Sequence, residues 1–155
     1  DTKLNNIMID NKTGKGLCVI DLDTVMPGSL LYDFGDSIRS GAVTSDENEQ
    51  DLSKYGLDIN LFKSYTEGFL SEAGHALNEE EIANLAFSAK LMTLECGVRF
   101  LTDYLNGDTY FKTEYPEHNL VRCRTQFKLV EDIEKHMDEM NECVNEIYRR
   151  SLIEG

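Results

Sequence analysis

The start of the chain contains two short apolar runs, over residues 6–10 and 17–20, separated by a polar segment. This segment includes Gly14 and Gly16, which can adopt the positive φ angles of a tight turn. Two apolar runs joined by a turn are typical of paired antiparallel strands. The pattern therefore predicts a β-hairpin at the start of the chain.

The rest of the chain, beyond Pro27 and Gly28, has mainly the helical period, with apolar residues three or four positions apart. An acidic loop over residues 44–56 and an aromatic-rich loop over 110–116 interrupt this period. A capping box, Asn78-x-x-Glu81, indicates where the third predicted helix begins. The predicted helices cover residues 30–41, 59–73, one continuous segment of about 28 residues from 79 to 106, and a last segment from about 120 to 147.

These elements predict an α+β fold that is mostly helical, with a short hairpin followed by a helical body. The 155 residues, of which 41% are hydrophobic, are enough for a single domain with its own core. We attribute the apolar stripe of the last predicted helix to packing in that core. We expect one domain over residues 1–155.

The charge of the chain restricts its partners. It carries 29 acidic and 15 basic residues, a net charge of -14. This excess repels nucleic-acid backbones and anionic lipids, so a phosphate-bearing ligand has to bring cations with it. No apolar run approaches the roughly 18 residues of a membrane-spanning helix, and no signal peptide is visible. We therefore predict a cytoplasmic protein with no nucleic-acid partner and no membrane partner.

The cysteines and histidines do not form a recognisable motif. Cys18, Cys96, Cys123 and Cys143 are far apart and include no C-x-x-C pair. We expect reduced thiols in the core rather than disulfides. The three histidines occur singly among polar neighbours, which argues against a zinc site.

Acidic and amide side chains gather around the predicted hairpin. Asp1 precedes Asn6 by five residues, at the entry to the first strand, and Asp21 and Asp23 follow the second strand. Alternation along a strand predicts that Asp21 and Asp23 lie on one side. Asn6, Asp21 and Asp23 then supply the oxygen ligands that Mg²⁺ prefers, and Asp1 can accept a proton or orient a hydroxyl. The alternative is that these aspartates only cap turns and helices.

Three stretches carry a resemblance to a known family: DTKLNN, CVIDLDTVMPGSLLYDFGDSIR and LECGVRFLTDYLNGDTYFKTEYPEHNLVRCRTQFKLV. Asp-x-x-x-x-Asn, a strand, a turn and Ile-Asp-x-Asp resemble the catalytic and metal-binding loops of the protein-kinase-like fold. The variant resembles the aminoglycoside phosphotransferase and choline kinase superfamily. Within it, the chain is most similar to N-acetylhexosamine 1-kinases, which use ATP to phosphorylate the anomeric hydroxyl of GlcNAc or GalNAc.

The resemblance implies a role for each residue of the acidic group. Asp1 corresponds to the catalytic base or hydroxyl-orienting group. Asn6 and Asp21 correspond to ligands of Mg²⁺, with Asp23 close enough to assist. Asp33, in the Tyr-Asp dipeptide of the family, would hold the DTKLNN loop. ATP would be the phosphoryl donor.

The resemblance also implies an acceptor site on the helical body. Arg99 and Tyr110 correspond to residues that bind the sugar. A guanidinium can bind sugar hydroxyls or an N-acetyl carbonyl, and an aromatic ring can cover a sugar face. A salt-bridged surface arginine and a packed tyrosine are the alternatives for these two residues.

The nucleotide-binding lobe of the family is not found in this sequence, which contains no Gly-rich phosphate loop with its partner lysine and glutamate. We therefore expect the chain to form the C-terminal lobe, to be inactive alone and to expose apolar surface where the other lobe would pack. Such a surface could support a homodimer.

Asp33-Phe34-Gly35 has the letters of the metal-binding DFG motif of protein kinases. In the fold that the chain resembles, the metal aspartate follows the catalytic aspartate by about twenty residues, across one hairpin. Asp21 lies at this separation, whereas Asp33 lies 32 residues after Asp1. We therefore assign the metal to Asp21 and not to the DFG tripeptide, and expect Asp36 only to cap.

Other functions remain open at this point. A kinase of the same fold could use an aminoglycoside, choline, ethanolamine, homoserine or methylthioribose as its acceptor. The negative charge suits a polycationic aminoglycoside, whereas the lack of tryptophan disfavours a choline cage. A non-enzymatic acidic domain that binds cations or a partner protein is the alternative from a different class.

Overall fold

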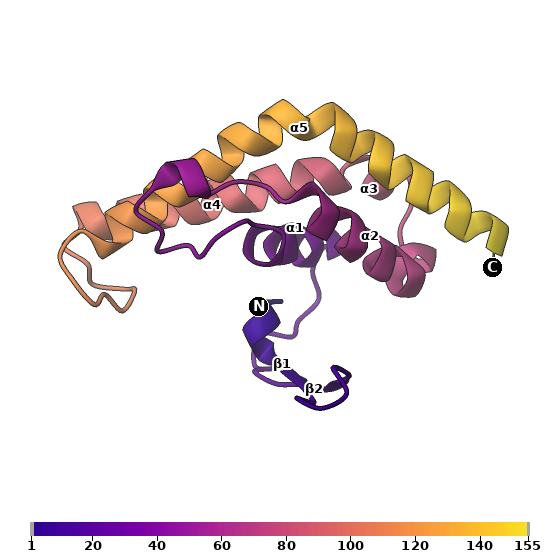
Figure 1. Ribbon diagram of the computed structural model, residues 1–155, viewed down its shortest axis with the longest axis horizontal. Coiled ribbons are helices and arrows are strands. Elements are labelled where there is room, and N and C mark those ends of the chain that lie inside the picture. Colours follow the sequence, from indigo (N-terminus) through magenta and orange to yellow (C-terminus); the bar gives the residue numbers. More distant parts are fainter. Residues whose placement is uncertain (1, 155) are drawn as a thin grey trace.

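A computed structural model describes residues 2–154, and it is mostly helical with one small antiparallel sheet, as predicted. The hairpin lies on one side of a layer of helices, with the two longest helices farthest from it (Figure 1). The elements are β1 (Ile7–Ile9), β2 (Gly16–Val19), α1 (Leu30–Gly41), α2 (Ile59–Ala73), α3 (Glu79–Ala83), α4 (Leu85–Leu105), α5 (His118–Glu154) and short 3₁₀ turns at Leu4–Asn6, Leu52–Lys54 and Gly74–Ala76.

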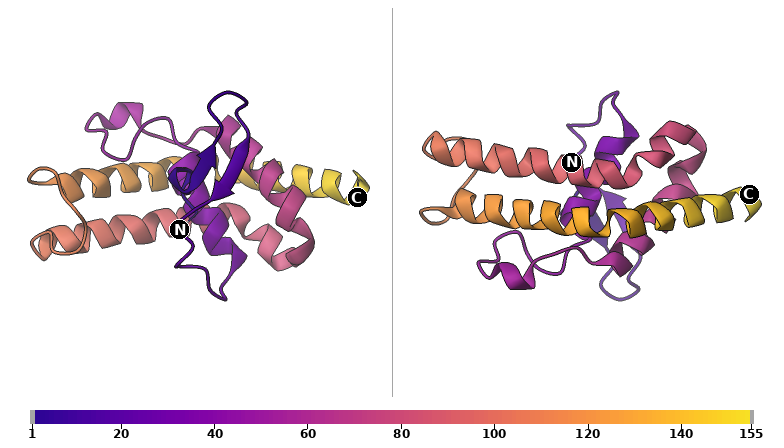
Figure 2. Two further views of the ribbon diagram at one scale, coloured as in Figure 1. Left: turned by 90° about the horizontal axis from the view of Figure 1, so that it is seen from below. Right: turned by 90° about the horizontal axis from the view of Figure 1, so that it is seen from above.

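The helical layer is built around the pair α4 and α5. These helices run side by side in both views of Figure 2, and they share the most extensive contact between any two elements. The helix α1 packs on α4, and α2 packs on α5. The helices predicted over residues 30–41 and 59–73 are confirmed. They begin where they do because the side chains of Ser29 and Asp58 accept hydrogen bonds from backbone N–H groups of the first turn.

The single helix predicted over residues 79–106 is wrong, because Asn84 divides it into α3 and α4. The backbone of Asn84 leaves the helical region, with φ -103° and ψ 4°. Its side-chain Nδ2 donates to the carbonyl oxygen of Glu80 at 2.8 Å. Asparagine side chains compete in this way with the backbone hydrogen bonds of a helix, which a pattern of apolar residues does not reveal.

The DFG tripeptide lies in the first half of α1 and belongs largely to the core. Phe34 is fully buried, and its ring makes edge contacts with Phe62, Tyr65 and Phe69 of α2. Gly35 is where α1 comes closest to α4. A Cβ atom at Gly35 would lie 2.5 Å from the carbonyl oxygen of Ser88 and 2.6 Å from Cγ of Met92. Phe34 and Gly35 of the tripeptide thus contribute to the packing of α1 against other helices.

We expect Gly35→Ala to reduce the free energy of unfolding by about 1–3 kcal/mol, because the new methyl group would overlap the backbone of α4. Gly41→Ala, at the C-terminal end of α1, is the matched control, since nothing lies within 4 Å of a Cβ atom placed there. Urea unfolding followed by circular dichroism measures both. Equal stability of the two variants would contradict this close approach of α1 and α4.

The hairpin is exposed on both faces. Every residue of β1 and β2 is exposed. Together, the strands and the segment that follows β2 expose nine large hydrophobic residues: Ile7, Met8, Ile9, Leu17, Val19, Ile20, Leu22, Val25 and Met26. An uncovered apolar surface was expected, and the hairpin has one; a second group of exposed hydrophobic residues lies on α4 (Phe87, Leu91, Leu94, Val98 and Leu105). Within residues 2–154, no helix has the length and apolar character needed to cross a bilayer.

The four cysteines are free thiols, as predicted, but their expected placement in the core is only partly right. Cys123 and Cys143 are buried, whereas Cys96 is half-buried and Cys18 is exposed. Cys18 is exposed because it lies on β2, neither face of which is covered.

Candidate functional site

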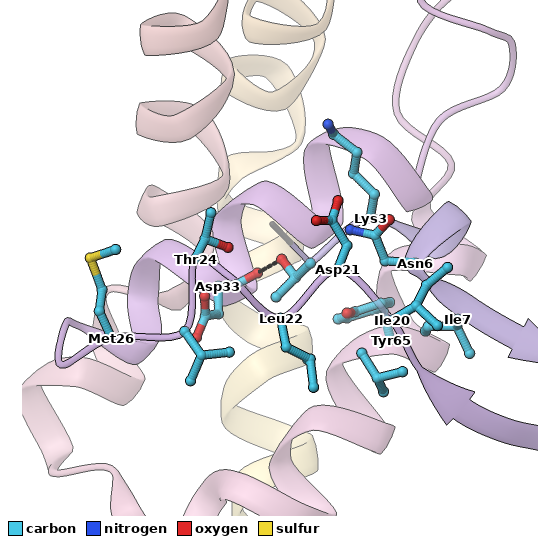
Figure 3. A pocket seen from close by; sticks show the side chains of 13 residues that line it. Lys3, Asn6, Ile7, Ile20, Asp21, Leu22, Thr24, Met26, Asp33 and Tyr65 are labelled. Atoms are coloured by element: carbon cyan, nitrogen blue, oxygen red, sulfur yellow. Dashed lines mark hydrogen bonds between the residues drawn. The ribbon is translucent and has the colours of Figure 1, made fainter.

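The register of the hairpin brings Asn6 next to the segment that carries the paired aspartates. Ile7 pairs with Val19, and the backbone N–H of Ile20 donates to the carbonyl oxygen of Asn6 at 2.9 Å. As a result, Asn6 and Asp21 line the same pocket, which has a volume of about 320 Å³ (Figure 3).

The backbone at Asp21 turns sharply. β2 ends at Val19, and Asp21 has φ +62°, in the left-handed region that aspartate tolerates better than most residues. Strand alternation is therefore the wrong explanation for the placement of Asp21 and Asp23. Asp21 lines the pocket with Asn6, whereas Asp23 does not. Interaction with the Asp23 carboxyl group across this turn raises the pKa of Asp21, which the nearby Lys3 ammonium partly offsets.

The chemistry of this group fits Mg²⁺. Two carboxylates that lie together repel each other, and a divalent cation relieves that repulsion. Mg²⁺ is commonly held by one or two carboxylates, with water and substrate phosphates completing its shell. Asn6, Asp21 and Asp23 could supply these protein oxygens. Among residues 2–154 no set of three His, Cys, Asp or Glu side chains is arranged to hold a metal.

The segment before β1 is fixed to α1 by two hydrogen bonds. The hydroxyl of Thr2 donates to the carbonyl oxygen of Asp33 at 3.0 Å, as Figure 3 shows. The hydroxyl of Ser37 donates to the carbonyl oxygen of Thr2 at 3.2 Å. Asp1, the candidate catalytic residue, lies outside the described residues, but its neighbour Thr2 is held at the start of α1. Asp33 takes part in this link through its backbone.

A second and larger pocket, of about 670 Å³, extends from this site towards α4 and the aromatic loop. Asp33 lines both pockets, so the two are adjacent. Arg99 and Tyr110, the candidate acceptor-binding residues, both line the larger one. The guanidinium carbon of Arg99 lies 5.8 Å from the ring centre of Tyr110 and 5.5 Å from that of Phe111. The structure thus brings together two residues that are eleven positions apart in the sequence.

Charged side chains form a network along one wall of the larger pocket, which sequence reasoning missed. Nε of Arg39 donates to Asp36 at 2.7 Å, and Nη1 of Arg39 lies 3.7 Å from Glu47. Nε of Arg122 lies 3.5 Å from the same Glu47 carboxyl group. The expectation that Asp36 only caps is therefore wrong. The i,i+3 spacing of Asp36 and Arg39 on a helix was the available signal.

The start of the chain matches a family model. Residues 1–60 match the model of a phosphotransferase enzyme family. This match supports the aminoglycoside phosphotransferase and kinase-like superfamily, whose members use ATP and generally Mg²⁺. It spans the hairpin, α1 and the acidic loop, and so includes all the candidate metal ligands. Arg99 and Tyr110 lie beyond the matched segment, and the match does not specify an acceptor.

Proposed function

We propose that this chain carries the catalytic and acceptor-binding residues of an ATP-dependent sugar kinase. Its acceptor would be the anomeric hydroxyl of an N-acetylhexosamine, GlcNAc or GalNAc. The observation that carries this proposal is the adjacency of the two pockets, one with the oxygen ligands Asn6 and Asp21, the other with Arg99 and Tyr110. The chain would then be the C-terminal lobe of the kinase, with the nucleotide also held by a second lobe.

The proposed division of labour follows from the chemistry of phosphoryl transfer. Most of the catalysis lies in aligning the acceptor oxygen with the phosphate and in neutralising charge. Asp1 would accept the hydroxyl proton or orient the hydroxyl for attack. Asn6, Asp21 and Asp23 would hold Mg²⁺, which supplies the charge neutralisation. The link between Thr2 and Asp33 supports this assignment, because it would fix the loop that carries Asp1.

The charges of the larger pocket favour an uncharged acceptor over a polycation. Its lining includes five basic residues (Lys3, Arg39, Arg99, Lys112 and Arg122) and four acidic ones (Asp33, Asp36, Glu47 and Glu95), a balance of +1 in a chain of net charge -14. The negative charge that seemed to suit an aminoglycoside is therefore not concentrated here. A polycation would gain little attraction at this wall of the site.

The aromatic rings of this pocket also argue against choline. Binding of a quaternary ammonium group relies on open aromatic faces. Here Arg99 lies over the rings of Tyr110 and Phe111, and Arg122 lies over the ring of Phe100 at 5.5 Å. The guanidinium groups of the protein thus already lie over these three rings. Their remaining N–H groups can instead donate to the oxygens of a sugar.

An acceptor panel tests the proposed function. The full-length protein is incubated with ATP, Mg²⁺ and one of GlcNAc, GalNAc, glucose, kanamycin, choline or homoserine, and products are identified by ³¹P NMR. We expect an anomeric phosphate on GlcNAc or GalNAc, and loss of the reaction when EDTA removes the metal. Phosphorylation of kanamycin alone would contradict the acceptor assignment. No transfer to any hydroxyl would favour the non-enzymatic alternative.

The exposed apolar surface of the hairpin bears on assembly. Nine large hydrophobic residues are uncovered there, which exceeds what isolated surface positions need. We propose that this surface packs against the nucleotide-binding lobe, or against a second copy of the chain when that lobe is lacking.

A further inference from the structure

A buried carboxylate, Asp103, lies in the last turn of α4, below the aromatic loop that joins α4 to α5. It is only 5% exposed. Three consecutive backbone N–H groups donate to its two oxygens, from Thr109 at 3.0 Å, Tyr110 at 2.8 Å and Phe111 at 2.9 Å. The side chain of Asn119 donates a further hydrogen bond, at 2.8 Å. One carboxylate therefore binds the backbone of a whole turn of this loop.

The surrounding residues hold the loop in a conformation that returns to Asp103. Gly107 and Asp108 have φ +88° and +58°, so the chain reverses just after α4. Asn119, fully buried at the start of α5, donates through Nδ2 to both Asp103 and Asp108, each at 2.8 Å. Burial raises the pKa of Asp103, but the hydrogen bonds from the loop and from Asn119 lower it by more, so the net shift is downward. The carboxylate is therefore ionised at neutral pH, as its four N–H donors require.

Two of the three bound amides belong to residues whose rings lie beside Arg99. The rings of Tyr110 and Phe111 pack edge to face, with centres 4.8 Å apart. Phe111 also packs on Phe100 of α4 at 4.7 Å. Tyr110 is 74% exposed, and its backbone N–H donates to the Asp103 carboxylate. Arg99 lies one helical turn before Asp103 on the same helix, so the loop residues that Asp103 binds lie close to Arg99.

We propose that Asp103 is a positioning residue for acceptor binding: it fixes the aromatic loop so that Tyr110 and Phe111 lie next to Arg99 in the larger pocket. Asp103 does not line that pocket and so would not touch the acceptor. Its effect would pass through the loop and fall on the affinity for the acceptor, while the metal and nucleotide sites stay unchanged. The part of this inference that concerns the acceptor rests on the proposed function.

Asp103→Asn tests the proposal, because asparagine has the same shape but no charge and faces the loop amides with one acceptor oxygen fewer. In the full-length protein we expect KM for the acceptor to rise about tenfold, with kcat and KM for ATP within about twofold of wild type. Asp138→Asn, an exposed change of the same kind on α5, is the control and should leave all three constants unchanged. A purely structural role would lower the folded fraction, and hence kcat, without raising KM.

A double mutant separates the role of the loop from other causes. Tyr110→Ala should raise KM for the acceptor, and adding Asp103→Asn should raise it by much less than in wild type, because residues that act together are not additive. Full additivity, or an unchanged KM for the acceptor in Asp103→Asn, would overturn the proposal.

Hydrogen exchange keeps the inference separate from the proposed function. In Asp103→Asn, exchange of the peptide that covers residues 106–115 should speed up at least about tenfold, with peptides from α1 and the second half of α5 unchanged. If this is seen in a protein that phosphorylates no acceptor, the proposed function fails while the anchoring of the loop by Asp103 stands. Unchanged exchange of that peptide overturns the inference whatever the activity of the protein.

Discussion

Asp21→Asn in the full-length protein is expected to lower kcat by about a thousandfold, because Asp21 is a proposed ligand of the Mg²⁺ that would neutralise the phosphates, and the change removes its charge. Asn6, Asp21 and Asp23 have only two carboxylates between them, so this change removes half the negative charge of the candidate metal site. The concentration of Mg²⁺ needed for half-maximal rate should also rise. A coupled assay of ADP release, repeated over a range of Mg²⁺ concentrations, measures both quantities.

Two other aspartate variants show whether the loss is specific to Asp21. Asp138→Asn makes the same chemical change at an exposed position of α5 and should leave the rate unaffected. Asp36→Asn breaks the contact with Arg39 in the larger pocket, so we expect a smaller loss that appears mainly in KM for the acceptor. An equal fall of kcat in Asp21→Asn and Asp36→Asn would rule out the assignment of the metal to Asp21.

Phe34→Ala is expected to lower the free energy of unfolding by about 3–5 kcal/mol, the usual result of removing a fully buried aromatic ring. The ring lies between α1 and α2 and contacts three aromatic side chains there. The surrounding helices cannot close the resulting cavity without losing contacts elsewhere. Urea unfolding followed by circular dichroism measures the effect on the free energy of unfolding.

A matched variant distinguishes this core position from an ordinary phenylalanine. Phe87 on α4 is 47% exposed, so Phe87→Ala should cost less than about 1 kcal/mol. If Phe34→Ala does not fold, Phe34→Leu provides the comparison, with a smaller loss in the same direction. Equal losses at the two positions would contradict the placement of the DFG phenylalanine in the core.

Local sequence was sufficient for most of the secondary structure. The hairpin was visible from two apolar runs and a glycine-containing turn, and α1 and α2 from periodicity, because both signals lie within a few consecutive residues. The break at Asn84 was missed, since the surrounding residues keep the helical period on both sides. It depends on a side-chain hydrogen bond to Glu80 that competes with the helix.

In the candidate site, too, the sequence shows residues that are close along the chain but not contacts between distant ones. Asn6, Asp21 and Asp23 could be chosen from the sequence because one hairpin joins them. The contact of Arg39 with Glu47 and that of Glu47 with Arg122 could not, because Arg122 lies 75 positions beyond Glu47 and meets it only when α5 folds back over the acidic loop. Asp103 looked like an ordinary polar residue near a helix end, and its burial under the aromatic loop was not visible in the pattern.

The DFG tripeptide shows what can be learned from spacing along the chain and what requires the folded structure. The choice of Asp21 over Asp33 as the candidate metal ligand came from spacing along the chain: Asp21 lies twenty residues after Asp1, as the metal aspartate does in the fold that the chain resembles. Only the tertiary structure decided what the tripeptide does: Phe34 fills the space between α1 and α2, and Gly35 lets α1 approach α4. Spacing within one hairpin is a local property of the chain. Burial and close approach depend on residues from other helices, which come together only when the chain is folded.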